Sequence, residues 1–201
     1  MALLSLFESN YEKTLMWVLI GVFLDSFDGL VARAFRATTE IGKQLDSLCD
    51  VISFGVVPGY FMYKYLSDFL SYELVPLSLS AFVVTLASIF RLARFNITPS
   101  SQLDFQGLPT PAFALFVIGI PFIPYEINPI IITVIVALLT VLMVSKIMLP
   151  SQKFVNGKPS NFFWIFAVVA IPVLLIFRSQ ALSLTVLTYA FFGMLCMRLR
   201  A

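Results

Sequence analysis

The sequence contains no histidine and few charged residues. Of its 201 residues, 12% are charged and 60% are hydrophobic, whereas soluble domains carry about 25% charge. A mean hydropathy of +0.96 excludes a soluble globular domain, a disordered chain, a coiled coil and collagen, and indicates an integral membrane protein. Without histidine, the chain alone cannot form a histidine general base, a histidine-rich metal site or a Ser-His-Asp triad. The formal net charge of +2 does not indicate nucleic acid as a partner.

Cysteine is scarce as well. Cys49 and Cys196 do not form a CxxC pair and both lie in apolar stretches, so we interpret them as small buried thiols. The first ten residues carry neither a basic region nor a small-residue cleavage site, and a cleavable signal peptide is therefore not expected. The apolar segments are expected to stay in the mature protein.

Long apolar runs dominate the rest of the chain, and a transmembrane helix needs about 20 such residues. Runs without charge occupy residues 74–90, 108–125, 127–145, 159–177 and 179–197. Two further runs reach full length only as helices over 14–34 and 41–67, which include aspartates; charge inside a bilayer is costly and normally functional. The sequence therefore predicts an all-α, polytopic transmembrane bundle of about seven helices, folded as a single domain over residues 1–201.

Lysine and arginine in the loops predict the orientation, because cytoplasmic loops carry an excess of them. With the loop after the first predicted helix inside, strict alternation leaves three basic residues outside, Lys13, Lys64 and Arg178. The other ten lie inside: Arg33, Arg36, Lys43, Arg91, Arg94, Lys146, Lys153, Lys158, Arg198 and Arg200. We therefore expect a multi-pass protein of the cytoplasmic membrane, with residues 1–13 outside.

Four aspartates lie in residues 23–50, at positions 25, 28, 46 and 50. On helices, Asp25 and Asp28 share one face, and so do Asp46 and Asp50, so two neighbouring helices can each offer a pair of carboxylates. Four such groups at a bilayer edge repel one another unless cations neutralise them, and oxygen ligands favour Mg²⁺, Mn²⁺ or Ca²⁺. Two divalent ions would balance the charge and suit displacement at phosphorus.

Small and basic residues accompany these aspartates. Gly42 lies one turn before the third aspartate and would let a bulky ligand approach the backbone. Thr38 or Thr39 can cap the second helix, and Arg33 adds a fixed cation for a phosphate. In the weaker interpretation, the acids only cap helices or pair with nearby basic residues at the membrane surface. Four acids at this spacing exceed what anchoring requires.

The pattern DxxDGxxAR, followed after eight residues by GxxxDxxxD, resembles the motif of the CDP-alcohol phosphatidyltransferases. The resemblance implies a membrane enzyme that transfers a phosphatidyl group from a CDP-linked lipid to an alcohol and releases CMP. It implies Mg²⁺ or Mn²⁺, with two ions, bound by Asp25, Asp28 and Asp46. Asp50 would lie near the metals and act as the general base. The cytidine and diphosphate site would be lined by Gly29, Ala32, Arg33 and Gly42.

Two later stretches, SIFRLARFN at 88–96 and FQGLPTPA at 105–112, resemble the phosphatidylserine synthase branch of that family, so the likeness covers most of residues 21–115. It implies CDP-diacylglycerol, or CDP-archaeol, and L-serine as substrates. Arg91 and Arg94 share the inner end of a predicted helix, and either guanidinium can bind the serine carboxylate or a lipid phosphate. Asn96 can help to orient the amine. In the alternative interpretation, the arginines only anchor the helix on the inner side.

Other functions are weighed against this one. A relative that uses glycerol 3-phosphate or inositol phosphate would need a larger basic pocket than the two arginines supply. An ion-coupled transporter also carries aspartates in the membrane, but near its middle, whereas these cluster towards one end. Within the expected reaction, a covalent phosphatidyl-aspartate and a direct displacement both fit the sequence.

The chain departs from the family pattern at its start. The family has one more helix before the one that ends in DxxDG; here it is missing or truncated, with MALLSLF as its last turns. The resemblance also implies a homodimer. Gly107, Pro109 and Pro111 are expected to shape a re-entry turn and not to touch substrate.

Overall fold

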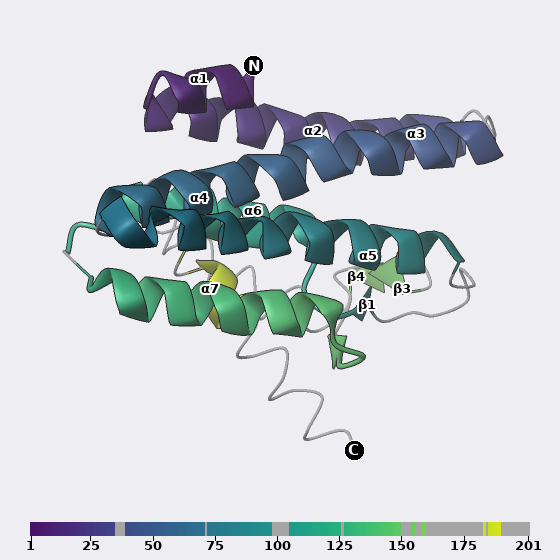
Figure 1. Cartoon of the computed structure of the whole chain (residues 1–201). Helices are drawn as coiled ribbons and strands as arrows, with labels where there is room; N and C mark the ends of the chain where they lie inside the picture. Colours follow the sequence, from purple (N-terminus) through teal and green to yellow (C-terminus); the bar gives the residue numbers. More distant parts are fainter. Residues whose placement is uncertain are drawn as a thin grey trace.

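The computed structural model describes residues 1–34, 39–70, 72–97, 105–125, 127–149, 154–155, 158–159, 183 and 185–189. In these residues the chain forms seven α-helices packed into a bundle (Figure 1). They are α1 (Ala2–Phe7), α2 (Tyr11–Ala34), α3 (Glu40–Val51), α4 (Val57–Phe69), α5 (Val83–Ile97), α6 (Thr110–Gly119) and α7 (Pro129–Val144). The predicted all-α bundle is confirmed.

Three segments of π-helix or 3₁₀-helix extend these α-helices. The π-helical segment η1 (Ile52–Val56) joins α3 to α4, and the 3₁₀ segments η2 (Tyr72–Phe82) and η3 (Ile120–Phe122) precede α5 and follow α6. In η1 the N–H of Val57 donates to the carbonyl of Ile52, five residues earlier. Pro58, which has no N–H to donate, follows directly. The α3–α4 helix therefore continues through a local widening at this proline.

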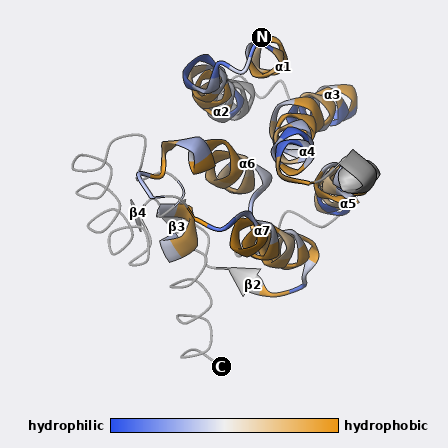
Figure 2. Ribbon diagram, turned by 60° about the vertical axis from the view of Figure 1, so that its left-hand side comes forward, coloured by the Kyte–Doolittle hydropathy of each residue, from blue (hydrophilic) through white to orange (hydrophobic). Residues whose placement is uncertain are grey.

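Two continuous helical segments are long and apolar enough to cross a membrane, Glu40–Phe69 and Leu77–Ile97. The apolar helices Thr110–Phe122 and Pro129–Val144 are shorter, and hydrophobic residues cover almost all of α7 (Figure 2). Five of the seven predicted spans thus correspond to α2, α3–α4, η2–α5, α6–η3 and α7. The predicted spans 159–177 and 179–197 lie outside the described residues, except for 183 and 185–189, which are helical.

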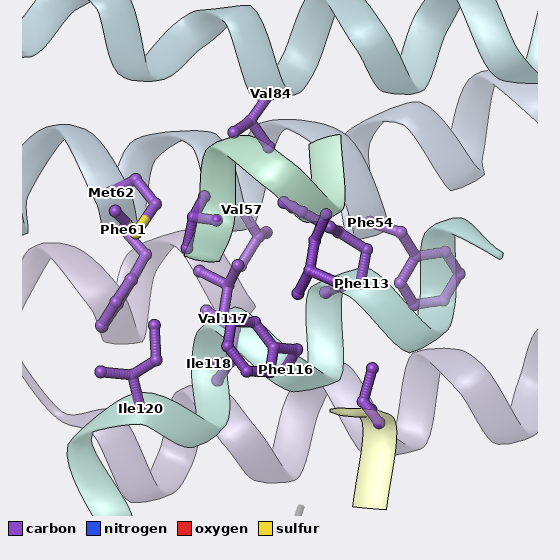
Figure 3. Packing of buried hydrophobic residues seen from close by; sticks show 14 of the residues in the cluster. Phe54, Val57, Phe61, Met62, Val84, Phe113, Phe116, Val117, Ile118 and Ile120 are labelled. Carbon is purple, nitrogen blue, oxygen red and sulfur yellow. The ribbon is translucent and has the colours of Figure 1, made fainter. Parts of the chain in front are cut away.

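The core lies where α4, α5 and α6 meet, and Figure 3 shows the side chains that fill it. Phe54 and Val57 from the α3–α4 helix pack there with Phe113 and Val117 from α6, and all four are fully buried or nearly so. α6 buries residues on every side, as expected of a helix that is hydrophobic all round. This central helix is the element around which the others are arranged.

Two glycines let α5 approach the α3–α4 helix closely. A Cβ at Gly59 would overlap Oγ1 of Thr85, and one at Gly55 would lie 3.0 Å from Cβ of Ser88. Oγ1 of Thr85 also donates a hydrogen bond to the carbonyl oxygen of Gly55, at 3.0 Å. Small residues at helix interfaces are typical of membrane bundles, where close backbone packing replaces the hydrophobic effect.

The chain starts with the short helix α1, as the interpretation of MALLSLF as helical turns requires. Ser9, at a φ of 56°, reverses the chain between α1 and α2. The ring of Phe7 lies 4.7 Å from that of Tyr60 on α4, and the ammonium of Lys64 contacts Oγ of Ser9. α1 is therefore held against α4.

Short strands pair in the loops. β1 (Phe105–Gln106) pairs antiparallel with β2 (Met148–Leu149), and β3 (Phe154–Val155) pairs in the same way with β4 (Lys158–Pro159). One expectation about packing is wrong: Cys49 is exposed on α3, because it faces outward from a helix that buries no residue.

All the segments with predicted site residues converge on one end of the bundle (Figure 1). There α2, α5 and α7 finish, and α3 and α6 begin. We call this the carboxylate end, after Asp25, Asp46 and Asp50. The opposite end holds α1, the last turns of α4 and the first turns of α7.

Candidate active site

Two aspartates from different helices meet at the carboxylate end. Asp25 comes from α2 and Asp50 from α3, both are half-buried, and their side chains share a hydrogen bond. Asp46, one turn earlier on α3, is exposed. Asp46 and Arg91 both lie within electrostatic range of Asp50. The structure thus brings together three of the four predicted aspartates.

The start of α3 is shaped by Thr39 and Gly42. Oγ1 of Thr39 accepts a hydrogen bond from the N–H of Gly42, at 3.0 Å, which is the predicted helix cap. Gly42 is exposed. Among the described residues, the only atom within 4 Å of a Cβ built at Gly42 would be Oγ1 of Thr39, at 3.0 Å. The missing side chain of Gly42 thus leaves room for the cap by Thr39, and the predicted role of Gly42 in ligand binding stays a prediction.

The other predicted residues of this motif lie on the last turns of α2, which ends at Ala34. They are Asp28, Gly29, Ala32 and Arg33. Their backbone is helical, and their side chains lie outside the part of the structure that is described. The predicted roles of these four residues stay predictions.

Arg91 is the buried cation of the site, with 7% of its surface exposed. Its Nη1 donates a hydrogen bond to Oγ1 of Thr110 at the start of α6, at 3.3 Å. Its Nε is buried and has no hydrogen-bond partner among the described residues. A buried donor without a partner is costly, and in a site it is a group ready for a ligand. Sequence reasoning missed Thr110, although a threonine just before a proline is a common helix start.

Arg94 has a different environment, one turn further along α5. Its Nη2 donates to the carbonyl oxygens of Val144, at 2.6 Å, and of Ser145, at 3.2 Å. The guanidinium also lies over the ring of Phe90, 5.6 Å from its centre. The carbonyls at the end of α7 lack partners within the helix, so Arg94 ties α5 to the end of α7.

Asn96 reaches α3 with its side chain. Its Nδ2 donates to Oγ of Ser47, at 2.9 Å, and its Oδ1 lies 3.1 Å from the same hydroxyl, which donates to it. The sequence predicts instead that this amide orients the amine of a substrate. In the structure it joins two helices.

The turn before α6 is built as predicted. Gly107 has a φ of +70°, which favours glycine, and a Cβ there would overlap the carbonyl oxygen of Met143. Its N–H donates to the carbonyl of Ile147, at 2.9 Å. Pro109 caps α6 and Pro111 lies in its first turn. This turn places Thr110 beside Arg91.

The donor chemistry of the aspartates fits a hard divalent cation. Two carboxyls in contact repel when both are ionised, so either a proton or a cation has to lie between them. Carboxylate oxygens are the ligands that Mg²⁺ and Mn²⁺ prefer. Among the described side chains no three acids or cysteines form a metal-binding group, and Asp28 is not one of those side chains. The contact between Asp25 and Asp50 is the part of the predicted metal site that the structure describes.

Comparison with known sequences identifies the family. The sequence model described as CDP-alcohol phosphatidyltransferase matches residues 1–145. The chain belongs to the CDP-alcohol phosphatidyltransferase family. The protein is therefore a membrane-embedded transferase, and the match covers α1 to α7 with every predicted site residue.

Several relatives in this family carry more specific names. The chain is 33% identical over 153 residues to the CDP-diacylglycerol–serine O-phosphatidyltransferase of Bacillus subtilis, covering 76% of this chain and 83% of that one. It is 35% identical over 180 residues to the protein of the same name from Methanocaldococcus jannaschii, covering 89% and 81%. It is 36% identical over 110 residues to the archaetidylserine synthase of Methanothermobacter thermautotrophicus, covering 54% and 46%.

Proposed function

We propose that this CDP-alcohol phosphatidyltransferase transfers the phosphatidyl group of CDP-diacylglycerol, or of the ether lipid CDP-archaeol, to the hydroxyl of L-serine. The products are phosphatidylserine, or its ether counterpart, and CMP. Relatives named as serine O-phosphatidyltransferases support serine as the acceptor. The observation that carries the proposal is the contact of Asp25 with Asp50, beside a buried arginine with an unpartnered donor.

Asp50 is the general base in this reaction. It is half-buried, and a second carboxyl and a guanidinium lie close to it. It takes the proton of the serine hydroxyl while that oxygen attacks the phosphorus of the lipid. A bond forms between the serine oxygen and phosphorus, the bond from phosphorus to the CMP oxygen breaks, and CMP leaves.

Arg91 binds the carboxylate of serine. A guanidinium offers a planar fork of donors that matches a carboxylate, and burial strengthens the pairing because water does not screen it. With Nη1 held by Thr110, the unpartnered Nε is free for the ligand. Arg94 donates to the end of α7 and is the weaker candidate for this role.

Asp25, Asp46 and Asp50, with Asp28 from the same motif, would hold Mg²⁺ or Mn²⁺, with two ions balancing four carboxylates. When bound, the ions supply positive charge for the diphosphate and for the leaving phosphate. Gly42 gives the nucleotide open access to the backbone of α3. Gly29, Ala32 and Arg33 on α2 complete this nucleotide and diphosphate site.

The protein crosses the cytoplasmic membrane with the carboxylate end facing the cytoplasm, where serine and CTP-derived nucleotides are soluble. The excess of ten basic residues over three on that side supports this orientation. The whole chain, residues 1–201, acts as one membrane domain, and two copies form a homodimer.

The test is CMP release by the purified protein in lipid nanodiscs that contain CDP-diacylglycerol and Mg²⁺ or Mn²⁺. Serine, glycerol 3-phosphate, inositol phosphate and no acceptor are compared, each with and without EDTA. We expect release that depends on serine and stops with EDTA. Release with another acceptor alone would contradict serine as the substrate, and release that survives EDTA would contradict the metal. Absence of release with every acceptor would contradict the enzyme itself.

A further inference from the structure

The end of α5 contacts α3 through several polar groups of Asn96. Besides its bonds with Ser47, Nδ2 of Asn96 lies 3.3 Å from Oε1 of Gln44 and donates to it. The backbone carbonyl of Asn96 accepts a hydrogen bond from the ammonium of Lys43, at 2.8 Å. Asn96 therefore forms hydrogen bonds with three residues of α3. We call Asn96, Lys43, Gln44 and Ser47 the α3–α5 clamp.

The clamp matters because the first turns of α3 have little else to hold them. None of its residues from Glu40 to Val51 is buried. Its large apolar side chains Ile41, Leu45 and Leu48 are 74%, 56% and 61% exposed. The core holds α3 at its C-terminal end, where it continues into η1 and α4, but apolar packing does not hold its first turns against α5. Yet α3 carries Asp46 and Asp50.

The clamp lies close to those aspartates. Ser47 follows Asp46 directly and precedes Asp50 by three residues, and Asn96 is on α5 together with Arg91. If the first turns of α3 bent away from α5, Asp46 would move away from the helix that carries Arg91. The bonds of Asn96 with Lys43, Gln44 and Ser47 oppose this bending.

We propose that Asn96 is a positioning residue, which holds the first turns of α3 against α5 and so keeps Asp46 beside Asp50, Asp25 and Arg91. It acts through Ser47 and Gln44 and does not bind serine. The inference rests on the proposed function for its effect on turnover, but the clamp itself can be tested without any reaction.

The experiment compares Asn96→Ala, Ser47→Ala and the double variant of the full chain in nanodiscs. Phe95→Ala is the matched control, because Phe95 is an exposed neighbour on the same helix. Three quantities are measured: hydrogen exchange of the amides of residues 43–50, the dissociation constant for Mn²⁺ by electron paramagnetic resonance, and kcat with KM for serine. If Asn96→Ala fails to fold, Ser47→Ala breaks the same bond from the other helix.

We expect both single variants to exchange faster in α3 and to bind Mn²⁺ about ten-fold more weakly, as when partners of metal ligands are removed. The kcat should fall while KM for serine stays within about two-fold of the wild-type value. The double variant should be little worse than Asn96→Ala, which already breaks the bonds of Asn96 with both Ser47 and Gln44. The control should match the wild type.

Two results would overturn the proposal. One is a rise in KM for serine in Asn96→Ala with exchange and Mn²⁺ binding unchanged, which would make Asn96 a substrate contact. The other is no change in any of the three quantities. A wild-type protein without serine-dependent CMP release would contradict the proposed function instead, and exchange and Mn²⁺ binding would still decide whether the clamp holds α3.

Discussion

At the carboxylate end of the bundle, hydrogen bonds between polar groups join the helices, whereas at the opposite end aromatic rings pack between the helices beside hydrogen bonds such as that from Lys64 to Ser9. Arg91 bonds to Thr110 and Asn96 bonds to Ser47 at the first. At the second, the ring centres of Phe7 and Tyr60 lie 4.7 Å apart and those of Tyr11 and Phe61 lie 5.9 Å apart, and each pair joins two helices. Hydrogen bonds fix direction and distance, while ring contacts tolerate small shifts. A reaction site needs the first kind of contact.

The opposite end also contains a cavity of about 450 Å³, lined by Tyr11, Phe61, Tyr65, Ile120, Pro121, Tyr125, Ile127, Pro129 and Ile132. Amphipathic tyrosines suit the level of the lipid headgroups. Between the two ends lies the apolar core around α6. The comparison therefore predicts that changes at the carboxylate end alter catalysis, and that changes elsewhere alter stability alone.

The largest effect is expected for Asp25→Asn. The change removes one of two carboxyls in contact and should lower serine-dependent CMP release at least about 100-fold, since the proposed metal site loses a ligand. The melting temperature should stay equal or rise, because like charges are separated. Asp68→Asn is the control, an exposed aspartate at the opposite end. Equal activity losses in the two variants would break the contrast between the ends.

A smaller effect is expected for Arg91→Lys, which keeps the charge but loses the planar fork. KM for serine should rise about 10- to 100-fold. Arg94→Lys should leave KM unchanged, because Arg94 donates to backbone carbonyls of α7. Steady-state kinetics with varied serine measures both. A larger rise of KM in Arg94→Lys than in Arg91→Lys would show that Arg94, and not Arg91, binds the serine carboxylate.

Gly59→Ala tests the middle of the bundle. The new Cβ would overlap Oγ1 of Thr85, so either Thr85 rotates and loses its hydrogen bond to Gly55 or α5 moves. The protein should lose about 1–3 kcal/mol of unfolding free energy. In the control Gly21→Ala the Cβ would lie 3.9 Å from Phe54, an ordinary contact. Alanine also favours the helix by about 0.5–1 kcal/mol. Thermal unfolding in nanodiscs should therefore separate the two variants, and equal melting temperatures would contradict the close packing of α4 on α5.

The smallest effect is expected for Tyr65→Phe at the opposite end. Tyr65 lines the cavity and stacks on Phe61, with ring centres 6.2 Å apart, and phenylalanine keeps the ring. CMP release should stay within about two-fold of the wild-type rate, as measured with saturating serine. A ten-fold loss would show that this end takes part in the reaction.

Much of the carboxylate end is predictable from the sequence. Asp25 falls near the end of one apolar run and Asp50 at the start of the next, and two antiparallel helices joined by a short loop bring such positions together. The turn at Gly107 is predictable because few residues other than glycine adopt its backbone conformation. In both cases the information lies within a short stretch of chain.

Other features could not be predicted, because they depend on partners far away in the sequence. Asn96 and Ser47 are 49 residues apart, and neither spacing nor charge marks them as a pair. Arg94 donates hydrogen bonds to backbone carbonyls, and the type of a residue does not reveal which side chain its carbonyl binds. The expectation of a buried Cys49 is wrong because an apolar neighbourhood in a membrane protein does not distinguish a core-facing position from an exposed one.

The central claim is that Asp50, in contact with Asp25, is the base of a serine phosphatidyl transfer at the carboxylate end. The most direct measurement is the single-turnover rate of CMP release by Asp50→Asn, with saturating serine and Mn²⁺, beside the wild type. The account predicts a rate at least about 100-fold lower, with thermal stability unchanged. A folded Asp50→Asn protein that releases CMP within a few-fold of the wild-type rate would contradict it.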